Sequence, residues 1–213
     1  MMTRSILDLG LLEIRDEETG SVYFGCDQEW YRSVWQRMAG CGPTVVSNIL
    51  LYLSRADSRK KKAPPPGKQE CLALMEEVWR YVTPTMRGIP SARILFDGAL
   101  SYTEAKRPDI RPRFLEIPRE RGRRPEFSEF LRFLGEALGN DTPAAFLNLD
   151  CGEETRLDSW HWVTVVSLRC EEDGSFAEAD IADEGKAKTV DLAVWYRTTS
   201  LGGGLVRFDR SQP

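Results

Sequence analysis

One cysteine stands where the sequence predicts a reactive thiol. Cys41 lies between Gly40 and Gly42, and Pro43 follows it, a residue that suits a first helical turn because its missing N–H costs nothing there. Apolar residues then recur at helical spacing as far as Leu53. A helix that begins at or just after Cys41 favours the thiolate, since the helix dipole stabilises negative charge at that end. The two glycines are expected to leave room for a substrate backbone.

The chain of 213 residues contains one histidine, His161. A thiolate nucleophile needs an imidazole that stabilises it and later protonates the leaving group, so His161 is the only candidate for that role. It begins a β-branched run that predicts a strand over 160–169. A single imidazole excludes metal sites that need two or three histidines from one chain, and no C-x-x-C motif occurs. No metal or other cofactor is therefore expected.

A carboxylate that orients the histidine can be sought in the next strand. The residues 172–174 form a turn signal, which predicts a hairpin with a second strand over 176–182. If the loop has these three residues, His161 lies opposite Gly185 and Asp183 is its diagonal neighbour on the same face. Asp180 would project to the other face. A two-residue loop would reverse this parity, so the choice of Asp183 depends on the loop length.

An acyl-transfer site also needs a donor for the oxyanion. Gln36, five residues before Cys41, carries the nearest side-chain amide, and Gln28 carries the next. Each candidate has a structural interpretation as well. Cys41 could be a small buried side chain, His161 a core histidine, Asp183 a turn residue and Gln36 a surface amide.

The order of the remaining elements indicates how these residues are positioned. Helical spacing predicts helices over 71–82, 91–103 and 127–138, and strand patterns occur at 113–117, 143–149, 188–194 and 205–208, the last two separated by a turn at 202–204. Helices come first and strands afterwards, which predicts an α+β fold with an antiparallel sheet. We expect a single domain over 1–213.

Composition limits the classes of partner. The formal net charge is −4, from 29 basic and 33 acidic residues, which gives no general attraction to nucleic acid or to anionic membranes. The basic segments 59–62 and 119–124 contain no aromatic residue and are interpreted as solvated loops. No run of 18 apolar residues occurs, and the N-terminus is too charged for a secretory signal. Five cysteines, an odd number, then favour reduced thiols in the cytoplasm.

Three segments together resemble a known family. They are Trp35-Gln36-Arg37-Met38-Ala39-Gly40-Cys41-Gly42-Pro43-Thr44, His161-Trp162-Val163-Thr164-Val165-Val166 and Ile181-Ala182-Asp183-Glu184-Gly185. They are similar to papain-like cysteine peptidases of the bacteriocin-leader-processing, or double-glycine, type, which includes stand-alone bacterial relatives. The resemblance covers roughly 23–195 and leaves 1–22 as an N-terminal extension.

The resemblance implies a papain-like fold, with N-terminal helices packed on a C-terminal antiparallel sheet. It also implies roles: Cys41 as nucleophile, His161 as acid and base, Asp183 as orienting group and Gln36 as oxyanion donor. Two departures occur. Glu184 stands where the family usually has proline, and Gln36 lies one residue closer to the cysteine than usual, which leaves Gln28 open as the donor.

These observations predict a cysteine peptidase or related thiol acyl-transfer hydrolase that acts on a peptide, protein or amide substrate. Nucleic acid and membrane partners are not expected. Two alternatives remain open from the sequence. One is a papain-like module that binds without turnover, and the other is an amide-transferring, transglutaminase-like enzyme on the same three residues.

Overall fold

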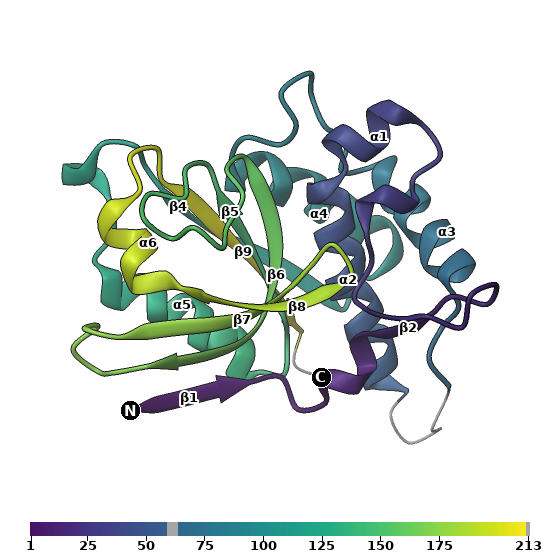
Figure 1. Cartoon of the computed structure of the whole chain (residues 1–213), viewed down its shortest axis with the longest axis horizontal. Coiled ribbons are helices and arrows are strands. Elements are labelled where there is room, and N and C mark those ends of the chain that lie inside the picture. Colours follow the sequence, from purple (N-terminus) through teal and green to yellow (C-terminus); the bar gives the residue numbers. More distant parts are fainter. Residues whose placement is uncertain (59–63, 212–213) are drawn as a thin grey trace.

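A computed structural model describes residues 1–58 and 64–211, and in these residues seven strands form one antiparallel sheet (Figure 1). The strand order is β4-β9-β5-β6-β7-β8, and β1 also pairs with β6. The strands are β1 (Met2–Ser5), β4 (Ile110–Ile117), β5 (Ala144–Asn148), β6 (His161–Cys170), β7 (Ala177–Asp183), β8 (Lys186–Asp191) and β9 (Gly203–Arg210). A separate two-stranded ribbon consists of β2 (Glu13–Arg15) and β3 (Val22–Phe24).

The helices pack around this sheet. They are α1 (Val34–Ala39), α2 (Cys41–Asp57), α3 (Lys68–Trp79), α4 (Ala92–Lys106), α5 (Phe127–Gly139) and α6 (Leu192–Thr198), with short 3-10 turns η1 (Leu9–Leu12), η2 (Gln28–Trp30) and η4 (Arg121–Arg123). Helix α2 is buried at every residue from 42 to 53, because it lies between the sheet and α3 (Figure 1). Helix α5 packs against β1, β5, β6 and β9, and α4 packs against β4. The predicted α+β fold with an antiparallel sheet is confirmed.

Strand β6 lies inside the sheet, so its first residue is held from both sides. One edge of β6 pairs with β5 over 161–165 and with β1 over 167–170, and the other edge pairs with β7. The first 22 residues, which we expected to form an extension, thus supply a strand of the main sheet. Ile6, just after β1, is buried.

The strand bounds differ most from the predicted ones near the C-terminal end of the chain. The strand predicted over 188–194 ends at Asp191, whose side chain accepts a hydrogen bond from Val194 N and caps α6. Helix α6 forms in place of the last part of the predicted strand because the helix buries the Trp195 side chain completely. The expected glycine turn at 202–204 is also wrong in part, since Gly203 begins β9. A Cβ at Gly203 would lie 2.0 Å from the Leu147 carbonyl oxygen, so the glycine permits close pairing of two strands.

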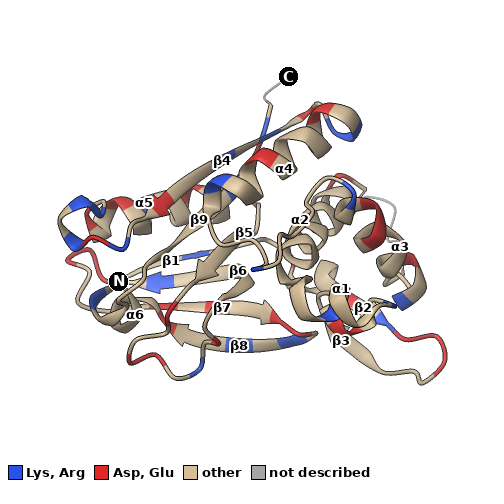
Figure 2. Cartoon of the chain, turned by 90° about the horizontal axis from the view of Figure 1, so that it is seen from above, with Lys and Arg blue, Asp and Glu red and all other residues tan. Residues whose placement is uncertain are grey.

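The structure describes one of the two basic segments that we interpreted as solvated loops. The basic segment 59–62 lies outside the described residues. In 119–124, the Arg124 guanidinium donates to the carbonyl oxygens of Pro118, Arg119 and Thr199, so this arginine ties loops together and is not simply solvated. Figure 2 shows basic and acidic residues interspersed over the elements seen from that side. Within the described ranges, none of the helices is long and apolar enough to cross a bilayer.

Candidate active site

Cys41 is the first residue of α2, as its sequence context predicts, and its side chain is partly exposed. The glycines beside it have a different role from the one we expected. A Cβ on Gly40 would lie 2.4 Å from the Gln36 carbonyl oxygen, and a Cβ on Gly42 would lie 2.7 Å from Ile89 Cδ1. Both glycines are buried, so they allow neighbouring segments to pack against the start of α2 and do not leave space for a substrate.

His161 and Asp183 are joined directly. His161 Nε2 lies 2.7 Å from Asp183 Oδ1, and the two side chains are 12% and 2% exposed. Because Nε2 is occupied by the carboxylate, Nδ1 remains for Cys41, which lines the same small void as the imidazole. The structure therefore brings together Cys41 from α2, His161 from β6 and Asp183 from β7.

The pairing of β6 with β7 sets this geometry through two irregularities. Glu171 N donates to Phe176 O, so the hairpin loop is one residue longer than the three-residue loop we expected. A bulge between Val165 and Ser167 then shifts the register back by one residue, and Thr164 pairs with Ala182. If this pairing continues to the start of β6, His161 lies opposite Gly185, as predicted. Asp183 therefore remains the diagonal neighbour of His161.

The turn after Asp183 explains one departure from the family pattern. Asp183 pairs with Lys186, so the hairpin between β7 and β8 has two loop residues, Glu184 and Gly185, with φ of 49° and 71°. Positive φ at both positions is typical of the tight turns that match strand twist. Proline has φ fixed near −65°, so it does not fit at position 184 in this turn.

The charges at the site depend on one another. Burial alone would lower the pKa of His161, but the hydrogen bond with Asp183 and the interaction with nearby Cys41 outweigh it and raise that pKa to about 10. Burial opposes ionisation of Asp183 in the same way, yet the neighbouring His161 and Lys188 hold the pKa of its carboxyl below the ordinary value of 3.8. The favoured state thus contains an imidazolium and a carboxylate.

The amide that reaches this cluster belongs to Gln28. A void of about 10 Å³ is lined by Cys41, His161, Asp183 and Gln28 among others, and it has room for one water molecule at most. Gln28 Oε1 is buried without a hydrogen-bond partner among the described residues. A half-turn of the amide exchanges its oxygen with its NH2 group, so this side chain can also direct a donor into the void.

Gln36 is engaged elsewhere. It lies in α1, where its backbone N–H donates to Ser33 Oγ at 3.1 Å and its side-chain Oε1 accepts from Ser33 at 3.0 Å. This is a capping box, which satisfies the free N–H groups at the start of α1. Gln36 is not among the residues that line the void beside Cys41 and His161.

Sequence reasoning missed Asn48, which links three segments behind the site. Its Oδ1 accepts from Cys26 N at 2.7 Å, and its Nδ2 donates to Thr164 Oγ1 at 3.0 Å. The side chain is therefore a bridge from α2 both to β6 and to the loop that carries Gln28. Only its position two helical turns after Cys41, directly before the largely apolar residues 49–53, could have indicated such a role.

The two tryptophans that flank His161 differ from each other. Trp162 is 2% exposed, and its indole N–H donates to Ile89 O. Trp160 is 55% exposed with φ of 59°, a backbone conformation that is uncommon for a large residue. Trp162 is therefore part of the buried wall beside His161, whereas the Trp160 side chain is open to solvent. Asn148 Nδ2 donates to Asp158 O and holds the loop that leads into β6.

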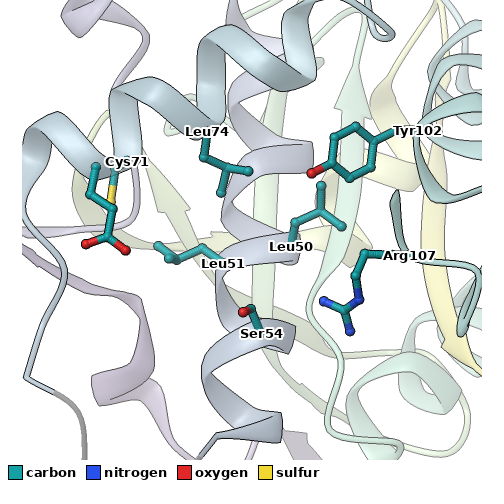
Figure 3. A pocket seen from close by; sticks show the side chains of 8 residues that line it. Leu50, Leu51, Ser54, Cys71, Leu74, Tyr102 and Arg107 are labelled. Carbon is teal, nitrogen blue, oxygen red and sulfur yellow. The ribbon is translucent and has the colours of Figure 1, made fainter. Parts of the chain in front are cut away.

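A second pocket lies farther along α2. It has a volume of about 260 Å³ and lies among α2, α3 and the end of α4, with Leu50, Leu74, Tyr102 and Arg107 around it (Figure 3). Leu50 is nine residues after Cys41, or roughly 14 Å along the helix axis. The Arg107 guanidinium is paired with Asp57 and Asp109. This pocket is not part of the cluster around His161.

The other four cysteines have different surroundings from Cys41. Cys26, Cys71 and Cys170 are buried, and Cys151 is partly exposed. The adjacent Cys71 side chain and burial raise the pKa of the Cys26 thiol well above its ordinary value. In the part of the chain that the structure describes, no group of three or more His, Cys, Asp or Glu side chains could hold a metal ion.

Comparison with solved structures adds to this geometry. UfSP from C. elegans, a papain-like cysteine protease, matches with a TM-score of 0.51 at 11% sequence identity, over 99% of this chain. The fold is that of papain-like cysteine peptidases. The chain spans about a third of UfSP, since the match covers 34% of that protein. No family model and no curated protein matches the sequence.

Proposed function

We propose that this chain is a cysteine peptidase or a related thiol acyl-transfer hydrolase, with Cys41 as nucleophile and His161 and Asp183 as its partners. The observation that carries the proposal is the connected series of side chains from the α2 terminus to β7. The 2.7 Å hydrogen bond of His161 with Asp183, and the small void that Cys41, His161 and Asp183 line together, establish this series. The papain-like fold supports a peptidase-like reaction independently.

The first half of the proposed reaction is acylation. The proton of the Cys41 thiol resides on His161 Nδ1 before the substrate reacts, so the nucleophile is a thiolate beside an imidazolium that Asp183 stabilises through Nε2. The sulfur then attacks the carbonyl carbon of the substrate. The imidazolium protonates the leaving amine, and a thioester on Cys41 remains.

The second half is hydrolysis of this thioester, with His161 as the base that activates water. Both halves pass through a tetrahedral oxyanion. We assign Gln28, in place of Gln36, as the side-chain donor to that oxyanion, because the Gln28 amide borders the void and has no other partner among the described residues. The backbone N–H groups in the first turn of α2 would also stabilise the negative charge of the oxyanion.

The proposed substrate is a polypeptide. Several large apolar side chains are exposed on segments next to the site: Val34, Trp35, Met38, Met86 and Trp160. Trp160 precedes His161, and Met38 lies three residues before Cys41. The segment of Met86 is held near α2 by the packing of Ile89 against Gly42. Exposed apolar groups around a nucleophile favour an extended peptide over a small polar substrate.

The motif resemblance narrows the proposal further. It favours a leader-processing type of peptidase, acting as a single cytoplasmic domain over residues 1–213 in a bacterium. Leader peptides of that type are therefore the first substrates to examine.

A mass-spectrometric assay with a peptide library in ¹⁸O-labelled water tests the proposal. Hydrolysis gives new C-termini that contain ¹⁸O, and we expect them from the wild type and from Cys151→Ala but not from Cys41→Ala. Turnover that persists in Cys41→Ala would contradict the assignment. Amide products without ¹⁸O in the presence of methylamine would indicate the amide-transferring alternative, and peptide binding without products would indicate the binding module.

A further inference from the structure

The Asp183 carboxylate is shared by two cations. Its Oδ1 contacts His161 Nε2, and its Oδ2 accepts from Lys188 Nζ, each at 2.7 Å. The Asp183 side chain is 2% exposed and that of Lys188 is 31% exposed. A lysine that touches the carboxylate is not needed for the reaction proposed above, so its presence there requires an explanation.

The sheet itself creates this arrangement. Lys188 pairs with Ile181 and Asp183 pairs with Lys186, so Lys188 and Asp183 are diagonal neighbours on one face. Asp183 is in turn diagonal to His161 on β6. Strands β6, β7 and β8 are neighbours in the sheet (Figure 1). By this pairing, the three side chains form one row across the strands.

We propose that Lys188 is a positioning residue of this site, which fixes the carboxylate of Asp183 and limits how strongly that carboxylate holds the His161 imidazolium. This inference rests on the proposed function, because it concerns the same three residues. It assigns to a fourth side chain a role that the reaction scheme does not contain.

The positioning effect follows from burial. A buried carboxylate oxygen without a partner is unfavourable, and each oxygen of Asp183 has one cationic partner. The two contacts together fix the plane of the carboxylate and direct Oδ1 at Nε2. Without Lys188, the hydrogen bond with His161 would be the one side-chain contact among the described residues that orients the carboxylate.

The electrostatic effect follows from the sharing of one anion. Two cations bound to opposite oxygens lie roughly 6 Å apart, close enough for the ammonium charge to oppose protonation of the imidazole by about one pKa unit. Cys41 from α2 and Asp183 from β7 act in the opposite direction on His161. Glu184 in the β7–β8 turn and Asp158 in the loop before β6 face Lys188 and stabilise its charge. A more acidic imidazolium transfers its proton to a leaving amine more readily.

The single histidine makes a direct test possible. In the ¹H–¹³C NMR spectrum of the full chain, imidazole signals come from His161 alone. We would titrate it in a Cys41→Ala background, which removes the thiol that also raises the His161 pKa. This readout requires no turnover, so failure of the proposed function and failure of the role of Lys188 are distinguishable.

We expect Lys188→Met to raise the pKa of His161 by about one unit, because the opposing charge is lost. Lys188→Arg, which retains the charge, should leave it within a few tenths of a unit. The matched control is Lys186→Met on the same strand, since Lys186 forms no ion pair among the described residues. Lys188→Gln is the second variant if the methionine protein does not fold. An unchanged pKa in both neutral variants, or an equal change in Lys186→Met, would overturn the proposal.

Discussion

At the scale of single residues, the site depends on which polar groups already have partners. Gln36 and Gln28 are both amides near Cys41 in the sequence, and sequence spacing alone could not separate them. The Gln36 side chain accepts a hydrogen bond from Ser33, whereas Gln28 Oε1 has no hydrogen-bond partner among the described residues. A side chain with an unused amide next to a nucleophile is available for a substrate, and a helix-capping side chain is not.

This difference predicts opposite phenotypes for two similar substitutions. Gln28→Ala should lower kcat roughly 10²-fold or more, because one oxyanion donor is removed. Gln36→Ala should leave kcat nearly unchanged and cost about 0.5–1 kcal/mol of stability through loss of the capping box. Steady-state kinetics and thermal unfolding of both variants measure these effects. A large loss of kcat in Gln36→Ala alone would reverse the assignment.

The pair of His161 and Asp183 predicts how stability changes with pH. The pKa of His161 is raised from 6.5 to about 10, so its contribution is complete below pH 6.5 and is lost as the pH rises toward 10. The pKa of Asp183 is lowered from 3.8, so its contribution is present above that value and is lost on acidification. The Tm difference between wild type and Asp183→Asn should thus be largest between about pH 4 and 6.5. A difference that stays constant from pH 5 to pH 10 would contradict these shifts.

At the scale of elements, the sequence predicts the helices and strands better than their irregularities. Cys41 at a helix start and His161 at a strand start follow from local patterns. The bulge in β6 and the longer loop before β7 do not, because both depend on side-chain packing over the whole hairpin. The longer loop shifts the strand pairing by one residue, and the bulge shifts it back before His161. Asp183 is therefore the neighbour of His161, as predicted, although the pairing nearer the loop differs from the predicted one.

Asn48 provides a test of how elements hold one another. Asn48→Ala should destabilise the protein by about 2–4 kcal/mol, since it leaves Cys26 N and the Thr164 hydroxyl without their buried partner. The control is Ser47→Ala on the same helix, because Ser47 is equally buried and its hydroxyl bonds only to Pro43 O of α2. Chemical denaturation measures both. Equal losses in the two variants would show that the bridge to β6 and to the Gln28 loop is unimportant.

At the scale of the whole molecule, the first residues complete the sheet. Strand β1 covers the edge of β6 that β5 leaves open, and Ile6 N donates to Val166 O next to the bulge. This pairing could not be predicted from the short polar pattern at 2–5, which has no strong strand signal. It joins residues more than 160 positions apart and supports the strand that begins with His161.

Deletion of residues 1–6 should therefore lower stability more than removal of a loose terminus. Loss of the ladder and of buried Ile6 should reduce Tm by about 5–10 °C, at a few °C for each kcal/mol in a chain of this size. Differential scanning calorimetry measures the change. Double substitution of the exposed Leu7 and Leu9 by serine is the matched control, and an equal or smaller Tm loss in the deletion would argue against a structural role for β1.

The central claim, that His161 activates the Cys41 thiol, is tested most directly by alkylation. Iodoacetamide rates at pH 7 can be measured for Cys41 and Cys151, the two partly exposed cysteines, by mass spectrometry of their peptides. The account predicts that Cys41 reacts at least about tenfold faster than Cys151 and that His161→Ala removes this advantage. Equal rates in the wild type, or a Cys41 rate that His161→Ala does not change, would contradict it.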